Sequence, residues 1–179
     1  LQPAATVQKG DGEAESLDGM IERLTAELTA YQDATYARRF SALVARVREA
    51  EATRTPGRSG LTEAVARYFF KLMAYKDEYE VARLFTDGDF ERSLGAQFDG
   101  KVRLTFHLAP PLAAARDPQT GHLRKREYGA WMMTAFKILT RLKRLRGTAF
   151  DIFGRTEERQ TERRLIDDYE RSLNDVITG

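Results

Sequence analysis

The segment GAQFDGKV (residues 95–102) comes close to the phosphate-binding pattern G-x-x-x-x-G-K-[ST]. In that pattern the last residue supplies a hydroxyl for Mg²⁺, and the loop leads into a helix whose N-terminus faces the phosphate. Here Val102 stands in place of the hydroxyl residue. The hydrophobic periodicity also predicts a helix before the loop and a strand after it. We therefore do not expect a nucleotide to bind here.

The segment DGDFE (residues 87–91) has acidic side chains at the spacing of a calcium-binding loop. Such a loop needs a glycine at its sixth position and, at its twelfth, a glutamate that binds the ion with both oxygens. Arg92 and Phe98 occupy those two positions. The segment is therefore predicted to be a turn before a short helix over residues 90–97, with Asp89 as the N-cap.

The two histidines, His107 and His122, lie on either side of a long turn-rich connection. A hairpin would bring them together, but zinc needs one or two further ligands, and no H-x-x-x-H or H-E-x-x-H pattern exists. No serine lies in the G-x-S-x-G pattern of many hydrolases. We expect both histidines to be structural or exposed to solvent, and we keep His107 as a candidate residue that reaches a neighbouring site.

Residues 124–146 carry eight basic residues and one acidic residue, a net charge of +7, in a chain whose total charge is +2. Lys137, Arg141 and Arg144 share one face of the helix predicted there, at spacings of four and three residues. We expect this face to be solvated. The alternatives are a protein or anion partner and, last, nucleic acid. These three residues are the candidate interaction residues, and we expect neither nucleic acid nor a membrane as the partner.

A further dense set of charges lies in KLMAYKDEYEVARLF (residues 71–85). The segment continues a helical pattern that starts near Thr62, and its apolar and tyrosine side chains point inward on such a helix. Lys76 and Glu80 then form an outer pair at the i, i+4 spacing. No histidine or nucleophile accompanies these charges, so we interpret the segment as a structural helix. We expect no catalytic residue, cofactor-binding residue or metal ligand in the chain.

The elements that position these residues follow from hydrophobic periodicity and capping residues. Residues 1–15 are predicted to be a disordered lead-in, and residues 16–179 a single domain. Ser16 and Thr156 are predicted N-caps, and Asp33 a restart that divides residues 17–52 if they do not form one long helix. The remaining predicted elements are a helix over about 62–85, a strand over 101–109 that pairs with 122–128, a helix over about 130–145, and a last helix with the stripe Leu165, Ile166, Tyr169, Leu173 and Val176.

The predicted fold is mainly α, with four to six helices around one core and a small β-strand or hairpin element near residues 101–128. The strand could instead complete a sheet in a neighbouring domain. The chain is 42% hydrophobic and 31% charged, as in globular proteins, and no apolar run approaches the roughly 20 residues of a membrane span. With no cysteine, it has no thiolate ligands for zinc or iron–sulfur clusters.

The start of the chain adds an expectation about its origin. It begins at Leu1 and shows no basic region followed by an apolar one, so no signal peptide is visible. We expect a cytoplasmic protein that is either processed or part of a longer chain.

Three long segments carry a resemblance to a known family. They are KLMAYKDEYEVARLFTDGDFE (71–91), LTFHLAPPLAAARDPQTGHLRKREYGAWM (104–132) and RGTAFDIFGRTEERQTERRLIDDYE (146–170). Together they resemble the region near the C-terminus of indolepyruvate ferredoxin oxidoreductases, in particular the long fused bacterial members with several domains on one chain. The likeness runs in order over about residues 60–175, and less distinctively over 16–52.

The resemblance implies a parent enzyme that oxidatively decarboxylates aryl 2-oxoacids, such as indolepyruvate, to acyl-CoA and reduces ferredoxin. It also implies thiamine diphosphate, magnesium and 4Fe-4S clusters in that parent. No catalytic motif of the family matches any position here, so the first hypothesis is a non-catalytic accessory domain that packs against the other domains of the oxidoreductase or lines their substrate or coenzyme A approach. The second is a free-standing helical binding module that docks an acidic protein, with ferredoxin as one candidate, through the basic face of residues 137–146.

Overall fold

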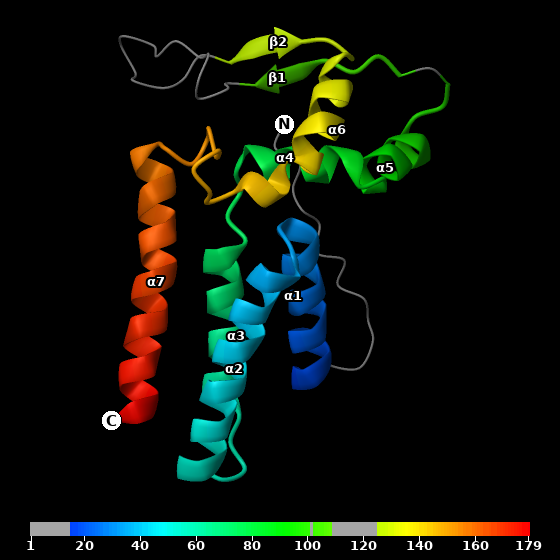
Figure 1. Ribbon diagram of the computed structural model, residues 1–179. Coiled ribbons are helices and arrows are strands. Elements are labelled where there is room, and N and C mark those ends of the chain that lie inside the picture. Colours follow the sequence, from blue (N-terminus) through cyan, green and yellow to red (C-terminus); the bar gives the residue numbers. More distant parts are fainter. Residues whose placement is uncertain (1–14, 101, 109–124) are drawn as a thin grey trace.

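A computed structural model describes residues 15–100, 102–108 and 125–179, and within them the mainly α fold with a small β element is confirmed. None of the helices in these ranges combines the length and the apolar character needed to cross a membrane. In chain order (Figure 1) the elements are α1 (Leu17–Tyr31), α2 (Ala34–Arg54), α3 (Gly60–Met73), α4 (Glu78–Thr86), α5 (Asp89–Gln97), β1 (Phe106–Leu108), β2 (Arg126–Tyr128), α6 (Met132–Arg141), the 3₁₀ helix η1 (Lys143–Leu145) and α7 (Glu157–Thr178).

Three predicted capping residues begin helices as expected. The carboxylate of Asp33 accepts hydrogen bonds from two backbone N–H groups in the first turn of α2, at 2.8 and 2.9 Å, and so separates α2 from α1. Ser16 caps α1 through a 3.1 Å bond, and Thr156 caps α7 through a 3.3 Å bond. These side chains satisfy N–H groups that have no partner inside the helix.

The single helix predicted over residues 62–85 is wrong, because α3 ends at Met73 and α4 begins at Glu78. The carboxylate of Asp77 accepts a 2.8 Å hydrogen bond from the N–H of Glu80, which makes Asp77 the N-cap of α4. Apolar residues recur at helical spacing on both sides of the break, so the sequence pattern does not reveal it. This extra break gives seven α-helices in the described ranges, where four to six were expected.

Glu80, predicted to lie on the outer surface beside Lys76, is buried instead. It forms a pair of 2.8 Å hydrogen bonds with Arg83, whereas Lys76 is exposed in the segment between α3 and α4. The predicted pair assumed a continuous helix through both residues. Because the helix is broken at Asp77, Glu80 turns toward the protein and takes Arg83 of its own helix as partner.

The segment between α4 and β2 differs from the prediction in its details. The N-cap of α5 is Gly88, whose φ of 92° favours glycine, and Asp89 is the first residue of the helix. β1 and β2 pair antiparallel with His107 opposite Glu127, which confirms the predicted pairing. The paired strands are shorter than predicted in the described ranges, and residues 101, 109 and 122–124 lie outside them.

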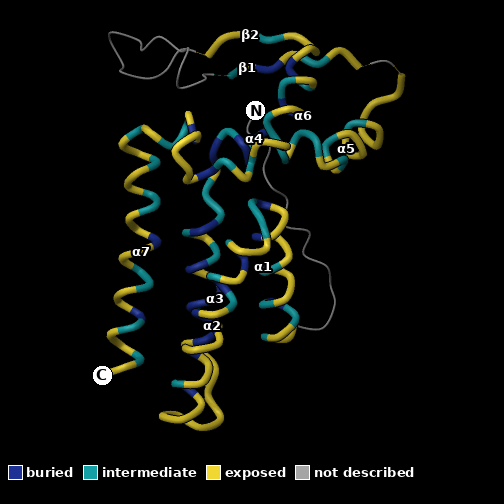
Figure 2. The backbone as a smooth tube through the Cα atoms, viewed as in Figure 1, coloured by how far each residue is buried: buried dark blue, intermediate teal, exposed yellow. Residues whose placement is uncertain are grey.

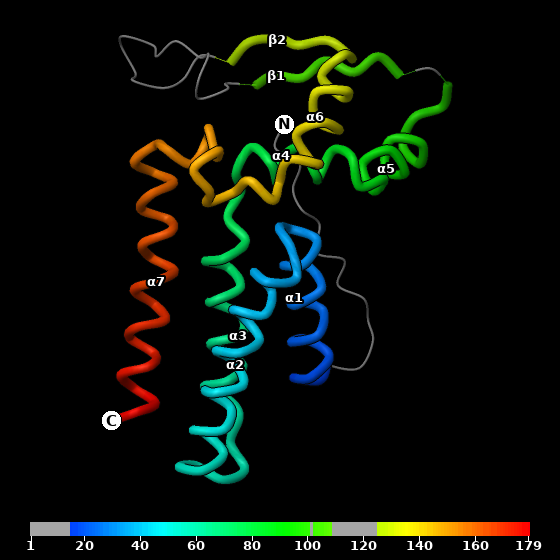
Figure 3. The backbone as a smooth tube through the Cα atoms, in the orientation of Figure 1, coloured from blue at the N-terminus to red at the C-terminus, as the bar shows by residue number. Residues whose placement is uncertain are grey.

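The buried side chains form two clusters rather than one core. The larger one joins α1, α2, α3 and α7, which we call the stalk, and the smaller one joins α4, β1 and α6, which we call the head. Figure 1 shows the stalk helices extending to one side of a layer that contains α4, α5, α6 and the strands. Figure 2 shows the buried backbone positions concentrated inside the stalk and beneath α6. The chain leaves the stalk after α3, builds the head, and returns as α7 (Figure 3).

Several apolar residues predicted to face inward are exposed. On α7, Ile166 and Leu173 are buried as predicted, but Leu165 and Val176 are exposed. α7 packs on the other stalk helices along one narrow face, which Ile166 and Leu173 occupy, and the neighbouring positions remain outside it.

Candidate functional site

The three basic candidates of the second half of the chain are all exposed. Lys137 and Arg141 lie on α6, whereas Arg144 lies on η1 because α6 ends at Arg141. Within the described ranges, none of the three has a carboxylate within 4 Å. Arg146, which belongs to the same basic segment, is buried. The basic face of residues 137–146 is therefore shorter than predicted and ends at Arg144.

His107 lies on the exposed side of β1, and its Nε2 is 3.8 Å from Oε1 of Glu127 on β2. This is a cross-strand pair on the surface. Pairs of this kind contribute about 0.2–1 kcal/mol to sheet pairing. His122 lies outside the described residues. Residues 15–100, 102–108 and 125–179 hold no group of three or more His, Cys, Asp or Glu side chains arranged to bind a metal ion.

Helix α6 and the residues that flank it carry a second apolar face, which is exposed. Trp131, Ile138 and Leu142 are 61%, 56% and 43% exposed. Their spacings of seven and four residues place them in one stripe along the helix. Met132 and Phe136 occupy the opposite side and are buried in the head. α6 therefore presents to solvent an apolar stripe with Lys137 and Arg141 beside it.

A buried ion pair joins the α3–α4 linker to the turn after η1. The guanidinium of Arg146 donates to both carboxylate oxygens of Asp77, with Nη2 2.8 Å from Oδ1, and the side chains are only 3% and 4% exposed. Its Nη1 donates to the carbonyl of Tyr31 at 2.7 Å, and its Cζ lies 3.7 Å from the centre of the Tyr31 ring. Burial works against the charged form, but the bonds to Asp77 outweigh it and raise the pKa of Arg146.

The carboxylate of Asp151 organises the loop between η1 and α7. It accepts hydrogen bonds from the N–H groups of Gly147 and Gly154 at 2.8 and 2.9 Å, and from the hydroxyl of Tyr79 at 3.3 Å. Burial and the neighbouring carboxylate raise the pKa of Tyr79 to about 12. A Cβ at Gly154 would overlap the Asp151 carboxylate and the Arg163 guanidinium, so this close approach requires glycine.

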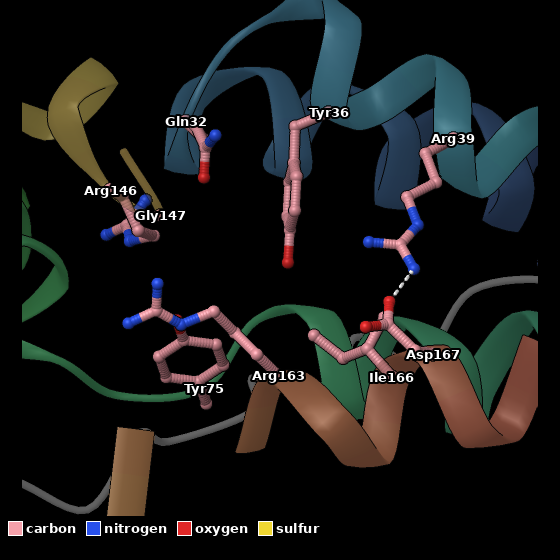
Figure 4. A pocket seen from close by; sticks show the side chains of 9 residues that line it. All are labelled: Gln32, Tyr36, Arg39, Tyr75, Arg146, Gly147, Arg163, Ile166 and Asp167. Atoms are coloured by element: carbon pink, nitrogen blue, oxygen red, sulfur yellow. Dashed lines mark hydrogen bonds and ion pairs between the residues drawn. The ribbon is translucent and has the colours of Figure 1, made fainter. Parts of the chain in front are cut away.

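Beside the Arg146 guanidinium lies a cavity of about 270 Å³. It lies where α1 meets α2, across from the first half of α7 (Figure 4). Four segments that are distant in sequence contribute to it, because the linker after α3 and the turn after η1 both reach this junction. Its lining residues are Gln32, Tyr36, Arg39, Tyr75, Arg146, Gly147, Arg163, Ile166 and Asp167.

Arginines dominate the charge of this cavity. Three guanidinium groups line it against the single carboxylate of Asp167. Arg39 bridges α2 to α7, because it contacts both Asp167 and Glu170. The hydroxyl of Tyr36 donates to the carbonyl of Met73 at 3.0 Å. Burial raises the pKa of the Tyr36 hydroxyl, so it is neutral at physiological pH.

Sequence reasoning missed both the buried pair and the cavity. Asp77 three residues before Glu80 is a capping signal that could have indicated the start of α4. No local signal marks Arg146 as buried, because its partner is 69 residues away in the chain. The predicted candidates His107, Lys137, Arg141 and Arg144 do not line the cavity.

Comparisons with known proteins place this architecture in a family. No curated protein and no solved structure matches the chain. The profile of one protein family, DUF6537, described as a family of unknown function, matches residues 17–179. The match begins at the first residue of α1 and includes the head, the stalk and the residues that line the cavity. The chain therefore belongs to the DUF6537 family.

Proposed function

We propose that the chain is a non-catalytic helical accessory domain of an enzyme of the indolepyruvate ferredoxin oxidoreductase type, and that it packs against the other domains of that enzyme. The choice of parent enzyme rests on the resemblance of residues 71–91, 104–132 and 146–170 to that family. The observation that carries the docking role is the exposed apolar stripe of α6.

The stripe has the composition of the centre of a protein interface. Fully burying a large apolar side chain contributes about 1.5–3 kcal/mol, and Trp131, Ile138 and Leu142, each about half exposed, leave part of this contribution unrealised in the isolated chain. Interfaces commonly combine such an apolar centre with a polar rim in which arginine is frequent. Lys137 and Arg141 supply basic groups of that rim. The face therefore suits a protein surface with an apolar patch bordered by carboxylates.

The cofactors that the resemblance implies belong to other domains of the enzyme. Thiolate ligation of a 4Fe-4S cluster does not fit this chain, because it has no cysteine. The described ranges also offer no cluster of ligands for the magnesium that accompanies thiamine diphosphate. This domain therefore takes part in no reaction step, and the whole enzyme is cytoplasmic.

The docking role is tested by adding the chain to the catalytic domains of such an oxidoreductase prepared without this region. We expect a complex by size-exclusion chromatography with light scattering, and loss of the complex when Trp131→Asp and Ile138→Asp are combined. Tyr68→Asp is the matched control, since Tyr68 on α3 is as exposed as Trp131. Failure of the unmutated chain to bind, or undiminished binding by the double variant, would contradict the docking role.

The non-catalytic role is tested with the chain alone. We expect no turnover of indolepyruvate when the chain is supplied with coenzyme A, thiamine diphosphate, magnesium and ferredoxin. Turnover by the chain alone would overturn the proposal.

A second candidate function is supported by the exposed basic face that ends at Arg144. Here the chain docks an acidic protein, with ferredoxin as the probe, and binding weakens with salt because exposed charges are screened beyond about 10 Å at 0.1 M. We expect Arg141→Glu combined with Arg144→Glu to abolish binding and its salt dependence. Arg58→Glu combined with Arg67→Glu, a reversal of equal size at exposed stalk residues, is the control. Equal binding by the two double variants would exclude this function.

A further inference from the structure

The cavity between α2, α7 and the turn at Arg146 has an excess of positive charge on its inner surface. The carboxylates that partner Arg146 and Arg163, namely Asp77 and Asp151, do not line it. Figure 4 shows the guanidinium groups of Arg146 and Arg163 turned toward the same part of the cavity. Each is paired with a carboxylate outside the cavity lining, and within the lining both present positive charge that favours an anion.

Several donors around the cavity are not used by the protein. A guanidinium has five N–H groups. Arg163 donates from Nε and Nη2 to the carbonyls of Arg159 and Gly154, and Arg39 donates from Nε and Nη2 to carboxylates of α7. Within the described ranges, Nη1 of both arginines and the side-chain amide of Gln32 have no acceptor. These are the groups that bind an oxyanion with paired N–H donors.

The remaining walls of the cavity suit an apolar body attached to that anion. The side chains of Tyr36, Tyr75 and Ile166 contribute rings and a buried aliphatic surface. Burial also raises the pKa of both tyrosines, so neither carries a negative charge that would repel an anion. A volume of about 270 Å³ lies just below the range of about 300–1,000 Å³ usual for small-molecule sites, so the ligand is small.

We infer that this cavity binds a small organic oxyanion, a carboxylate or a phosphate, through the unused donors of Gln32 and Arg163, beside the positive charge of Arg146 and with its apolar part against Tyr36 and Ile166. Bound there, the anion connects α7 to the α1–α2 corner and to the turn after η1. It therefore stabilises the folded chain in proportion to its occupancy. The inference is independent of the proposed function, because the cavity shares no lining residue with the α6 stripe and needs no other domain.

The test is a nuclear magnetic resonance titration of the ¹⁵N-labelled 179-residue chain. The probes are sodium benzoate and inorganic phosphate, with sodium chloride at matched ionic strength as the reference. We expect saturable shifts of the Arg163 and Arg39 Nε–H signals and of the Gln32 amide, with a Kd on the order of 1 mM. Tighter binding of benzoate identifies a carboxylate with an apolar body, and tighter binding of phosphate identifies a phosphate compound.

Two variants connect the shifts to the cavity. Gln32→Met removes a donor that holds no other described group in place, and Arg163→Lys keeps the charge while removing the planar pair of donors. We expect each variant to weaken binding about five- to tenfold, about 1–1.4 kcal/mol. The exposed control Arg67→Lys should bind the anion as tightly as the unmutated chain. If Arg163→Lys does not fold by circular dichroism, Gln32→Met decides alone. Shifts that match those of chloride, or undiminished binding by Gln32→Met, would overturn the inference.

Discussion

At the residue scale, Asp77 and Arg146 fix the geometry of the junction between stalk and head. A buried ion pair gains little over a well-packed apolar pair, but breaking it leaves an uncompensated charge inside the protein. Here each residue of the pair also fixes a local structure, because Asp77 caps α4 and Arg146 donates a hydrogen bond to the carbonyl of Tyr31 at the end of α1. The pair therefore specifies where the chain leaves the stalk and where it returns.

Replacing Arg146 should be among the most destabilising single changes in the chain. We expect Arg146→Met to lower the free energy of unfolding by about 3–5 kcal/mol, because Asp77 remains buried without a partner. Asp77→Asn in the same chain should recover part of this loss, since it removes the charge and retains an N-cap. Urea denaturation followed by circular dichroism measures both, with Arg144→Met as the exposed neighbouring control. A loss no larger than that of the control would show that the pair does not hold the junction.

Glu78 gives a second residue-scale prediction, in which the charge of a carboxylate opposes folding. Burial raises its pKa above the usual value, and the Arg159 guanidinium 3.7 Å away offsets this only in part. Within the described ranges its Oε2 has no hydrogen-bond partner. Because the folded-state pKa is the higher one, folding loses stability as pH rises through the interval from 4.5 to that pKa.

We therefore expect Glu78→Gln to raise the free energy of unfolding at pH 7 by up to about 1 kcal/mol, because the neutral amide carries no charge for burial to oppose. The gain should disappear near pH 4, where Glu78 itself is protonated. Thermal unfolding of both chains at pH 7 and pH 4 measures it. A destabilised variant at pH 7 would show that the pair with Arg159 matters more than burial.

At the element scale, α3 depends on another helix for its N-terminal cap. Ser59 makes no side-chain capping bond. Instead the buried carboxylate of Glu51 on α2 accepts hydrogen bonds from the N–H groups of Leu61 and Thr62, both at 2.8 Å, and from the Thr62 hydroxyl at 2.6 Å. Burial raises the pKa of Glu51, but these bonds outweigh it and leave the pKa below its usual 4.5. The α2–α3 corner is thus held by one carboxylate.

Glu51→Gln should lower the free energy of unfolding at pH 7 by about 1.5–3 kcal/mol, the range for hydrogen bonds to a charged group. A depressed folded-state pKa means that this stability is complete above pH 4.5 and is lost as pH falls through the folded-state pKa. The difference in the free energy of unfolding between Glu51→Gln and the unmutated chain should therefore shrink on acidification, because the unmutated chain then loses the stability that the Glu51 carboxylate contributes. Denaturation at pH 7 and pH 3 measures it, and an equal difference at both pH values would contradict the capping role.

The elements show which parts of the fold a sequence can predict. Helices that begin at a local capping residue, such as Asp33 and Thr156, were predictable because the signal and its effect lie within one turn. The α3–α4 break was missed because the apolar period continues across it. The burial of Arg146 and the cavity were missed for a different reason: they depend on contacts between segments far apart in the chain, which no local pattern encodes.

At the scale of the whole molecule, the two clusters of buried side chains predict two units of stability. Phe136 stacks on Phe85 in the head with ring centres 5.2 Å apart, whereas Phe69 stacks on Phe40 and on Tyr169 of α7 in the stalk, at 6.0 and 5.8 Å. Polar contacts at the junction, such as the 3.0 Å bond from the Tyr31 hydroxyl to the Tyr75 carbonyl, connect the two. Two regions that have separate apolar clusters and are connected by polar contacts can unfold separately.

Hydrogen exchange of two matched variants tests this division. Phe136→Ala and Phe69→Ala each remove a buried aromatic ring, at a cost of about 3–5 kcal/mol. We expect Phe136→Ala to accelerate exchange in α4 and α6 while α1, α2 and α3 keep their protection. Phe69→Ala should accelerate exchange throughout the stalk and also in the head, because α4 and α6 attach to the ends of stalk helices through the Asp77–Arg146 junction. Equal acceleration of all helices by Phe136→Ala would mean that the head and the stalk unfold as one unit, and that the junction couples them more strongly than their separate clusters suggest.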